Sequence, residues 1–442
     1  MSSPNASSSS SLGRKSAPIT LEKPLEKAAR AGGVVGKMFP AKPCATTGNA
    51  AKAVRRGAPK TLTPKSPKIA AACKFEDADL SRKALTEHAL ADAARGRGAL
   101  SNASGRFEPL AREPVDDGWD SLADLPALKT QITHENARVI ITRNESPDIS
   151  FDRSINPYRG CEHGCVYCFA RPTHAYLGLS PGLDFETRLF VKDGAAALLE
   201  RELSSPRYQP RTIAIGTNTD PYQPIEKEHR VMRQVLEVLA RANHPVGIVT
   251  KSALVLRDLD ILAPMAAKGL AKVALSVTSL DGKLSRLMEP RAAQPERRLE
   301  TIRALSEAGV PTSVMVAPII PSINDHEIEA ILARAHAAGA REAGYVMLRL
   351  PLEVEDIFSQ WLLAHFPDRY RHVMSLVRGV RDGKAYDSSW GKRMTGTGPY
   401  AWVTGRRFEI AAAKAGFNQQ RAKLRTDLFV SPRRGAQQLS LL

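Results

Sequence analysis

The sequence of 442 residues contains only five cysteines and has no run of 18 apolar residues. The missing apolar run argues against a membrane-spanning helix, and the N-terminus lacks the apolar centre of a secretory signal. The cysteines are too few and too unevenly placed for a disulfide scaffold, which favours a reducing compartment. We therefore expect a cytoplasmic protein with no membrane partner.

The formal net charge is +17, and the first 70 residues carry +11 of it. That segment contains 13 Lys and Arg but only two acidic residues, Glu22 and Glu26. Residues 1–105 are rich in Ser, Ala and Pro and show no sustained period, so we expect a disordered basic arm. Such an arm can contact nucleic acid or another polyanion. A solvated arm without a partner, or an organelle transit peptide, has a similar composition.

Three of the five cysteines, Cys161, Cys165 and Cys168, fall within eight positions on a segment bounded by glycine. Their C-x3-C-x2-C spacing lets three thiolates converge on one soft metal centre and leaves one corner of a four-coordinate site open. An iron–sulfur cluster with one exposed iron fits this pattern. A structural zinc needs a fourth ligand, for which His163 or His174 is available. Three plain buried thiols are the remaining alternative.

The chain around and after these cysteines alternates short β-branched runs with longer helical patterns. Strands are predicted at 149–155, 212–217, 246–250, 272–277, 312–317 and 344–350. Helices are predicted near 193–204, 226–242, 257–267, 295–308, 325–338 and 353–365. Six strand-then-helix units imply a parallel sheet with right-handed crossovers. We predict an α/β fold with a partial (β/α)6 barrel of the TIM type, and a doubly wound sheet is the alternative.

The predicted domain organisation has five parts. They are a basic arm over 1–105, a lead-in segment over 106–145 that packs on the barrel, the barrel over 146–370, a C-terminal cap over 371–418 and a flexible tail over 419–442.

These features resemble the radical S-adenosylmethionine (radical SAM) superfamily. In that family a C-x3-C-x2-C loop follows the first strand of a partial barrel, and an aromatic residue commonly precedes the last cysteine, as Tyr167 does here. The resemblance spans about residues 145–365 and implies a [4Fe-4S] cluster whose open iron binds the amino and carboxylate groups of SAM. One electron then cleaves the sulfonium and releases a 5′-deoxyadenosyl radical. The resemblance also implies an electron donor such as flavodoxin or ferredoxin as a partner, and we expect a monomer.

SAM requires a cation for its carboxylate, hydrogen-bonding groups for its ribose and a flat surface for its adenine. Parallel α/β folds bind ligands at the carboxyl ends of their strands. The cofactor-binding candidates there, with the aromatic of the cysteine loop, are Tyr167, Thr217, Asn218, Lys251 and Ser276.

Each of these candidates has a structural alternative. Lys251 could pair with Asp258 or Asp260 at the next helix start, and Thr217 and Asn218 could belong to a turn around Asp220. Ser276 could be an ordinary capping hydroxyl, and Tyr167 could be a core aromatic.

More closely, residues 216–224, 249–252 and 289–291 are similar to uncharacterised lyase-like proteins in the branch that includes the spore photoproduct lyases, which repair a thymine dimer in DNA. In those lyases a cysteine near the end of the second strand returns a hydrogen atom to the product radical, and a tyrosine follows the last cluster cysteine. Here residues 211–222 contain no cysteine, and Phe169 follows Cys168. Because both hydrogen donors are missing, we expect a lyase-like enzyme acting on nucleic acid, in DNA repair or modification, without photoproduct repair itself. The alternative is a zinc-bearing nucleic-acid adaptor without catalysis.

No catalytic residue can be assigned from the sequence. Tyr222, Tyr345 and Tyr386 are candidate radical relays, and Glu289 and Arg291 are candidates to clamp a polar substrate. An internal salt bridge is the alternative for the last two residues, and Arg349 faces the same choice.

Three basic residues surround the cysteine loop, namely Arg159, His163 and Arg171. We expect them to donate hydrogen bonds to the cluster sulfurs, which would raise the reduction potential.

Overall fold

The computed structural model describes residues 96–110 and 128–432, which lie in one compact unit, Pro67–Leu442. The greater part of the expected basic arm and the end of the expected tail lie outside the described residues. None of the described helices is long and apolar enough to cross a membrane.

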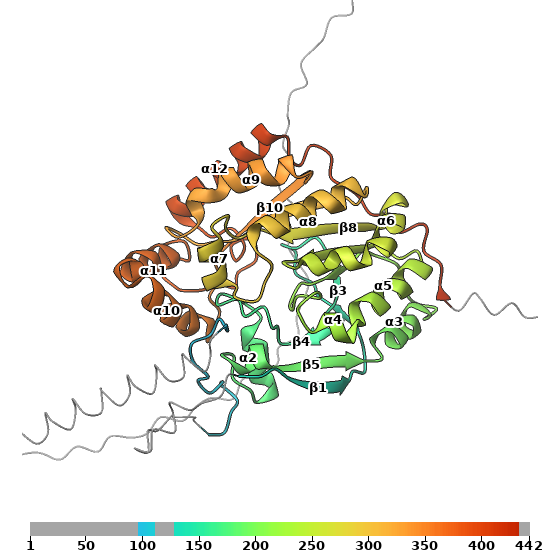
Figure 1. Cartoon of the computed structure of the whole chain (residues 1–442), viewed down its shortest axis with the longest axis horizontal. Coiled ribbons are helices and arrows are strands. Elements are labelled where there is room, and N and C mark those ends of the chain that lie inside the picture. The colour runs from blue at the N-terminus through green and yellow to red at the C-terminus, as the bar shows by residue number, and fades with distance from the viewer. Residues whose placement is uncertain (1–95, 111–127, 433–442) are drawn as a thin grey trace, which may run out of the picture. The chain divides into compact units, whose positions relative to one another are not determined.

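A seven-stranded sheet forms the centre of the unit, in the order β10-β9-β8-β7-β6-β3-β2 (Figure 1). Six strands run parallel: β3 (Arg153–Ile155), β6 (Ile213–Ile215), β7 (Val246–Thr250), β8 (Ala271–Ser276), β9 (Thr312–Ile319) and β10 (Glu342–Met347). The edge strand β2 (Ile141–Arg143) pairs antiparallel with β3. The sheet of described strands is open, because β2 and β10 are its two edges. The prediction of a partial (β/α)6 barrel is confirmed.

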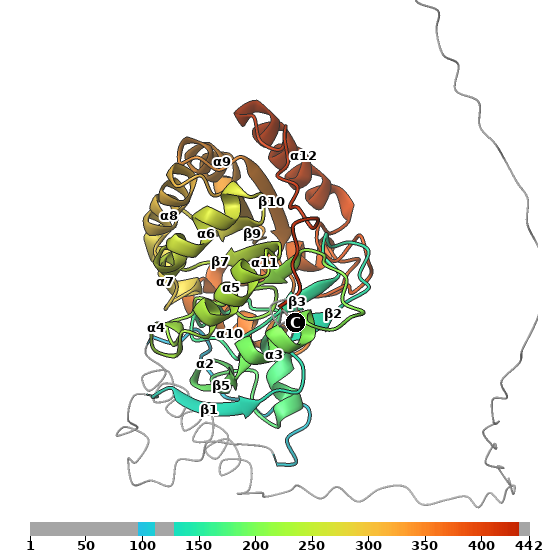
Figure 2. The same ribbon diagram turned by 90° about the vertical axis from the view of Figure 1, so that its right-hand side faces the viewer.

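Helices follow the strands and lie along one face of the sheet (Figure 2). The main crossover helices are α3 (Ala195–Leu203), α5 (Val231–Arg241), α6 (Leu259–Ala267), α8 (Pro295–Glu307) and α9 (Ile328–Ala337). The helix α10 (Val354–His365) follows the last strand and packs in a second core cluster with the cysteine loop. In α5 the residues Val231, Val235 and Leu239 recur every four positions and are buried. This spacing is what one apolar helix face requires, and each such side chain contributes about 2 kcal/mol when it leaves water.

The two edges of the sheet are connected by residues 391–394. Met347 N, at the end of β10, donates to Met394 O at 2.8 Å. Asp148, in the loop between β2 and β3, accepts bonds from Arg393 Nε at 2.7 Å and Arg393 Nη2 at 2.5 Å. This segment lies between α11 (Tyr370–Gly379) and α12 (Gly398–Ala415), which the sequence analysis did not predict. The boundaries of the cap stay a prediction.

A second sheet of three strands was also not predicted. In it β1 (Gln131–Asn136) is parallel to β5 (Arg188–Asp193), which pairs antiparallel with β4 (Tyr158–Arg159). The β1 sequence QITHEN contains one apolar residue, so it lacks the alternation of apolar and polar residues that predicts a strand.

Residues 96–105, which we assigned to the disordered arm, pack against the cysteine loop. Glu186 of α2 (Asp184–Thr187) accepts bonds from Gly98 N at 2.9 Å and Ala99 N at 2.8 Å. Ala99 is fully buried. A Cβ atom on Gly98 would lie 1.7 Å from Gly164 O, so only glycine fits at this contact. The expected arm therefore ends at least ten residues too late. We call residues 96–105 the strap.

We predict that Gly98→Ala loosens the strap and lowers the free energy of unfolding by about 1–3 kcal/mol, because its Cβ overlaps the cysteine-loop backbone. The matched control is Gly282→Ala, whose Cβ would meet no atom within 4 Å. Urea denaturation and limited proteolysis of both variants measure the effect. Equal stability of the two variants would contradict the close contact.

Candidate active site

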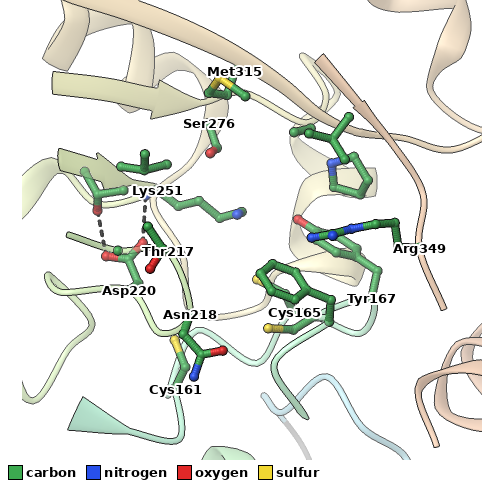
Figure 3. Close-up of a pocket in the computed structure, with 18 of the residues that line it drawn as sticks. Cys161, Cys165, Tyr167, Thr217, Asn218, Asp220, Lys251, Ser276, Met315 and Arg349 are labelled. Atoms are coloured by element: carbon green, nitrogen blue, oxygen red, sulfur yellow. Dashed lines mark hydrogen bonds between the residues drawn. The ribbon is translucent and has the colours of Figure 1, made fainter. Parts of the chain in front are cut away.

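A cavity of about 290 Å³ opens at the carboxyl ends of the parallel strands (Figure 3). Residues that follow β3, β6, β7 and β10 line it, together with the last residue of β8. The lining includes every metal and cofactor candidate from the sequence: Cys161, Cys165, Tyr167, Cys168, Thr217, Asn218, Lys251 and Ser276. The structure brings these eight residues together, while their individual roles stay predictions.

The cysteine loop is held through its backbone from three directions. Cys161 N donates to Phe185 O at 2.9 Å, and Val166 N donates to Met288 O at 3.1 Å. The fully buried Arg171 donates from Nε to Cys165 O at 2.9 Å. These bonds fix the direction of the loop without using any thiol.

The basic residues near the loop do not take the positions that we expected. Arg171 bonds backbone carbonyls and Glu186, and Arg159 pairs with Glu135 at 2.6 Å. His163 lies against Asp220, with Nδ1 3.4 Å from Oδ2. The expectation that these side chains bond sulfurs is therefore wrong for Arg171 and Arg159, because carbonyl and carboxylate oxygens are the stronger acceptors within reach.

Burial raises the pKa of the Cys161 and Cys165 thiols. For Cys165, the Lys251 ammonium opposes this effect in part. Thiolates at these positions therefore need a positive centre beside them, and a bound metal provides one.

The donor set fits an iron–sulfur cluster better than a single zinc ion. Cluster sites are built from cysteine thiolates, and three thiols border one cavity here. Within 96–110 and 128–432, no three His, Cys, Asp or Glu side chains converge closely enough to hold a single ion. His174 Nε2 is bonded to Arg188 O at 2.9 Å and its ring packs on Phe185, so it is not a fourth ligand at this cavity.

Lys251 reaches into the cavity from the end of β7. Its Nζ lies 5.9 Å from the centroid of the Tyr167 ring, and Figure 3 shows the side chain extended between the two walls of the cavity. Asp258 and Asp260, the alternative partners of Lys251, form ion pairs with Arg233 instead, at 3.1 and 2.7 Å. Lys251 therefore offers its charge to a ligand.

Asp220 fixes the backbone from which Lys251 projects. Its carboxylate accepts bonds from Lys251 N at 2.8 Å, Thr250 Oγ1 at 2.7 Å and Tyr222 N at 2.9 Å. Burial alone would raise the pKa of Asp220, but His163 and the hydrogen bonds from Thr250 and Lys251 outweigh it and lower the pKa to about 2. The predicted turn at Asp220 is present, and it also positions the cofactor candidates.

A glycine at the end of β6 brings Thr217 and Asn218 close to β7. Gly216 has a φ of 87°, and a Cβ there would lie 2.0 Å from Val249 O. Asn218 N donates to Asn156 Oδ1 at 3.2 Å, which ties the turn to the segment before the cysteine loop. The turn therefore presents the side chains of Thr217 and Asn218 to the cavity.

Glu289 positions Tyr167 instead of clamping a substrate. The Tyr167 hydroxyl donates to Glu289, Thr278 Oγ1 donates to it at 2.7 Å, and Arg298 forms an ion pair with it. Glu289 is 1% exposed. Burial raises its pKa, and Arg298 opposes the shift. Glu289 therefore forms an internal salt bridge, and its partner is Arg298.

The other four catalytic candidates, Tyr386 among them, also lie outside the cavity lining. Arg291 pairs with Glu162 at 3.4 Å. Tyr222 is buried in the main core, and the Tyr345 ring packs on Phe408 of α12 with centroids 4.8 Å apart. Their catalytic roles stay predictions.

Several apolar residues of the site had no signal in the sequence. They line the cavity and are Ile149, Phe151, Met315, Val346, Met347 and Met394. Met394 comes from a Gly-rich segment without periodicity, and its place depends on tertiary contacts alone.

Comparisons with known proteins identify the family of the chain. The model of the radical SAM superfamily matches residues 155–335, from the end of β3 into α9. Uncharacterized protein Rv2578c of Mycobacterium tuberculosis is 39% identical over 230 residues, which cover 51% of this chain and 68% of that protein. Uncharacterized protein MJ0683 of Methanocaldococcus jannaschii is 26% identical over 219 residues, covering 50% and 78%. The chain belongs to the radical SAM superfamily.

The protein is accordingly a radical SAM enzyme. The alternative of a zinc adaptor without catalysis therefore does not apply. Among solved structures, spore photoproduct lyase complexed with dinucleoside spore photoproduct is similar with a TM-score of 0.46 and 14% identity, covering 65% of this chain and 80% of that chain.

We predict that Arg298→Met lowers the free energy of unfolding by about 3–5 kcal/mol, because it leaves the buried Glu289 without its cation. The matched control on the same helix is Arg297→Met, whose exposed pair with Glu300 should change stability by no more than about 0.5 kcal/mol. Urea denaturation measures both. Similar losses in the two variants would show that Glu289 does not depend on Arg298.

Proposed function

We propose that this radical SAM enzyme binds a [4Fe-4S] cluster on Cys161, Cys165 and Cys168 and reductively cleaves SAM to a 5′-deoxyadenosyl radical, with nucleic acid as its substrate. One observation carries the cofactor part. All three cysteines and all five predicted SAM-binding residues line a single cavity at the carboxyl ends of the strands.

Each of the five SAM-binding candidates has a chemical role in this proposal. Lys251 pairs with the SAM carboxylate, and Thr217 and Asn218 bond the ribose hydroxyls. Tyr167, held by Glu289, offers a flat face to adenine. Ser276 adds a hydroxyl at the end of β8. When bound, the cluster supplies the electron that cleaves the sulfonium.

The substrate is proposed from charge. The first 70 residues carry a net charge of +11, which favours a polyanion such as nucleic acid. DNA repair or modification is the corresponding reaction class. We further propose that a flavodoxin or ferredoxin supplies the electron and that the enzyme acts as a monomer.

We predict that anaerobic reconstitution gives a brown protein with about four iron and four sulfide per chain, which forms 5′-deoxyadenosine from SAM when dithionite is added. Cys165→Ser should lose most of the iron, whereas the control Cys73→Ser, outside the triplet, should keep it. Iron analysis and chromatography of the nucleoside measure these outcomes. A colourless protein that binds zinc tightly and forms no 5′-deoxyadenosine would overturn the proposal.

We predict that Lys251→Met weakens the binding of S-adenosylhomocysteine to the reconstituted protein at least about tenfold, because a charged hydrogen bond is lost inside a cavity. Lys283→Met, at an exposed site on α7 (Gly282–Met288), is the control. Isothermal titration calorimetry measures both dissociation constants. Unchanged affinity in Lys251→Met would assign the lysine to another task.

A further inference from the structure

Arg349 is a cation without an acidic partner in the part of the chain that the structure describes. It follows β10 and lines the cavity beside Cys168 and Phe169. Its guanidinium carbon lies 4.2 Å from the centroid of the Phe169 ring, and this stacking is the contact that fixes it. Among residues 96–110 and 128–432, no side chain or carbonyl accepts a hydrogen bond from it.

The charged groups around Arg349 do not neutralise it. Asp148 is taken by Arg393 through two bonds, at 2.7 and 2.5 Å. The buried Arg381 donates to backbone carbonyls, among them Leu348 O at 2.9 Å, and adds a second positive charge. Burial and the nearby Arg393 lower the pKa of Arg349. Arginine stays charged in proteins, so this wall of the cavity has an excess of positive charge.

An uncompensated guanidinium beside a cavity is suited to an anion. Its forked donors match the oxygens of a phosphate. Phe169 is 42% exposed, so its ring also offers surface for a flat partner. The lining nearby is apolar and includes Ile149, Phe151 and Met394. A phosphate joined to a flat ring, as in a nucleotide, matches both features.

A second cavity adjoins the first. It has a volume of about 440 Å³ and shares Ile149 and Phe151 with the first cavity. Its other lining residues are polar and include two carboxylates, Glu145 and Asp152, and Arg211 pairs with Asp152 at 3.0 Å.

We propose that Arg349, stacked on Phe169, binds a backbone phosphate of a single-stranded nucleic acid and so selects the substrate of the enzyme. The inference rests on the proposed function and names the group that recognises its substrate. Lys251 then binds the carboxylate of the cofactor, and Arg349 binds a phosphate of the substrate.

The test is a fluorescence anisotropy titration of a short labelled oligothymidylate with the reconstituted full-length protein over a range of salt concentrations. We expect Arg349→Gln to weaken binding about tenfold at low salt. The slope of log K against log salt should fall in magnitude by about 0.7, the value for one phosphate contact on a single strand. The control is Arg407→Gln on α12, an arginine paired with Glu329 at 2.8 Å, which should bind as the unaltered protein does.

A second variant and a second ligand complete the test. Arg349→Lys keeps the charge but loses the fork, so it should keep the salt slope and bind several-fold more weakly. S-adenosylhomocysteine should bind Arg349→Gln as it binds the unaltered protein. If this ligand loses affinity by the same factor as the oligonucleotide, Arg349 belongs to the cofactor site and the inference is overturned.

Unaltered oligonucleotide binding and salt slope in both Arg349 variants would also overturn the inference. The iron content and the 5′-deoxyadenosine yield of the unaltered protein test the proposed function separately. Those two measurements can succeed while the assignment of Arg349 fails.

Discussion

The buried ion pair between Arg171 and Glu186 supports the region around the cysteines. Arg171 Nη2 lies 2.5 Å from Glu186 Oε1, and both side chains are fully buried. Arg171 also bonds Cys165 O, while Glu186 accepts the backbone amides of Gly98 and Ala99. A buried charge that loses its partner costs several kcal/mol. The strap, α2 and the cysteine loop therefore keep one common arrangement, and the three thiols border the cavity as a consequence.

Two cations of the cavity, Lys251 and Arg349, lie in different surroundings. Lys251 projects from a backbone that Asp220 fixes, and it faces Tyr167 and the cysteines. Arg349 lies on the wall formed by β10 and stacks on Phe169. Both charges lack an acidic partner among the described residues, in contrast to Arg298 and Arg291, which are paired internally. The two unpaired cations suit two different anions, and the proposed enzyme needs one for its cofactor and one for its substrate.

Much of the barrel could be predicted because its signals are local. The β-branched run at 246–250 and the four-residue repeat of Val231, Val235 and Leu239 each specify an element by themselves. The three cysteines followed from their spacing. The five cofactor candidates followed from the resemblance to the radical SAM superfamily together with the rule that parallel strands bind ligands at their carboxyl ends. The strap, β1 and the segment at 391–394 could not be predicted, because their order comes from tertiary hydrogen bonds to Glu186, β5 and Asp148. The pairing of Glu289 with Arg298 instead of Arg291 could not be predicted either, because it also depends on tertiary packing.

The central claim is that the three cysteines hold a cluster with one iron open to SAM. Low-temperature electron paramagnetic resonance of the dithionite-reduced, reconstituted protein, titrated with SAM, tests it most directly. The account predicts the signal of a reduced [4Fe-4S] cluster whose g-values change when SAM is added, and a change that requires at least about ten times more SAM in Lys251→Met. A cluster signal that SAM leaves unaltered in the native sequence, or no cluster signal, would contradict it.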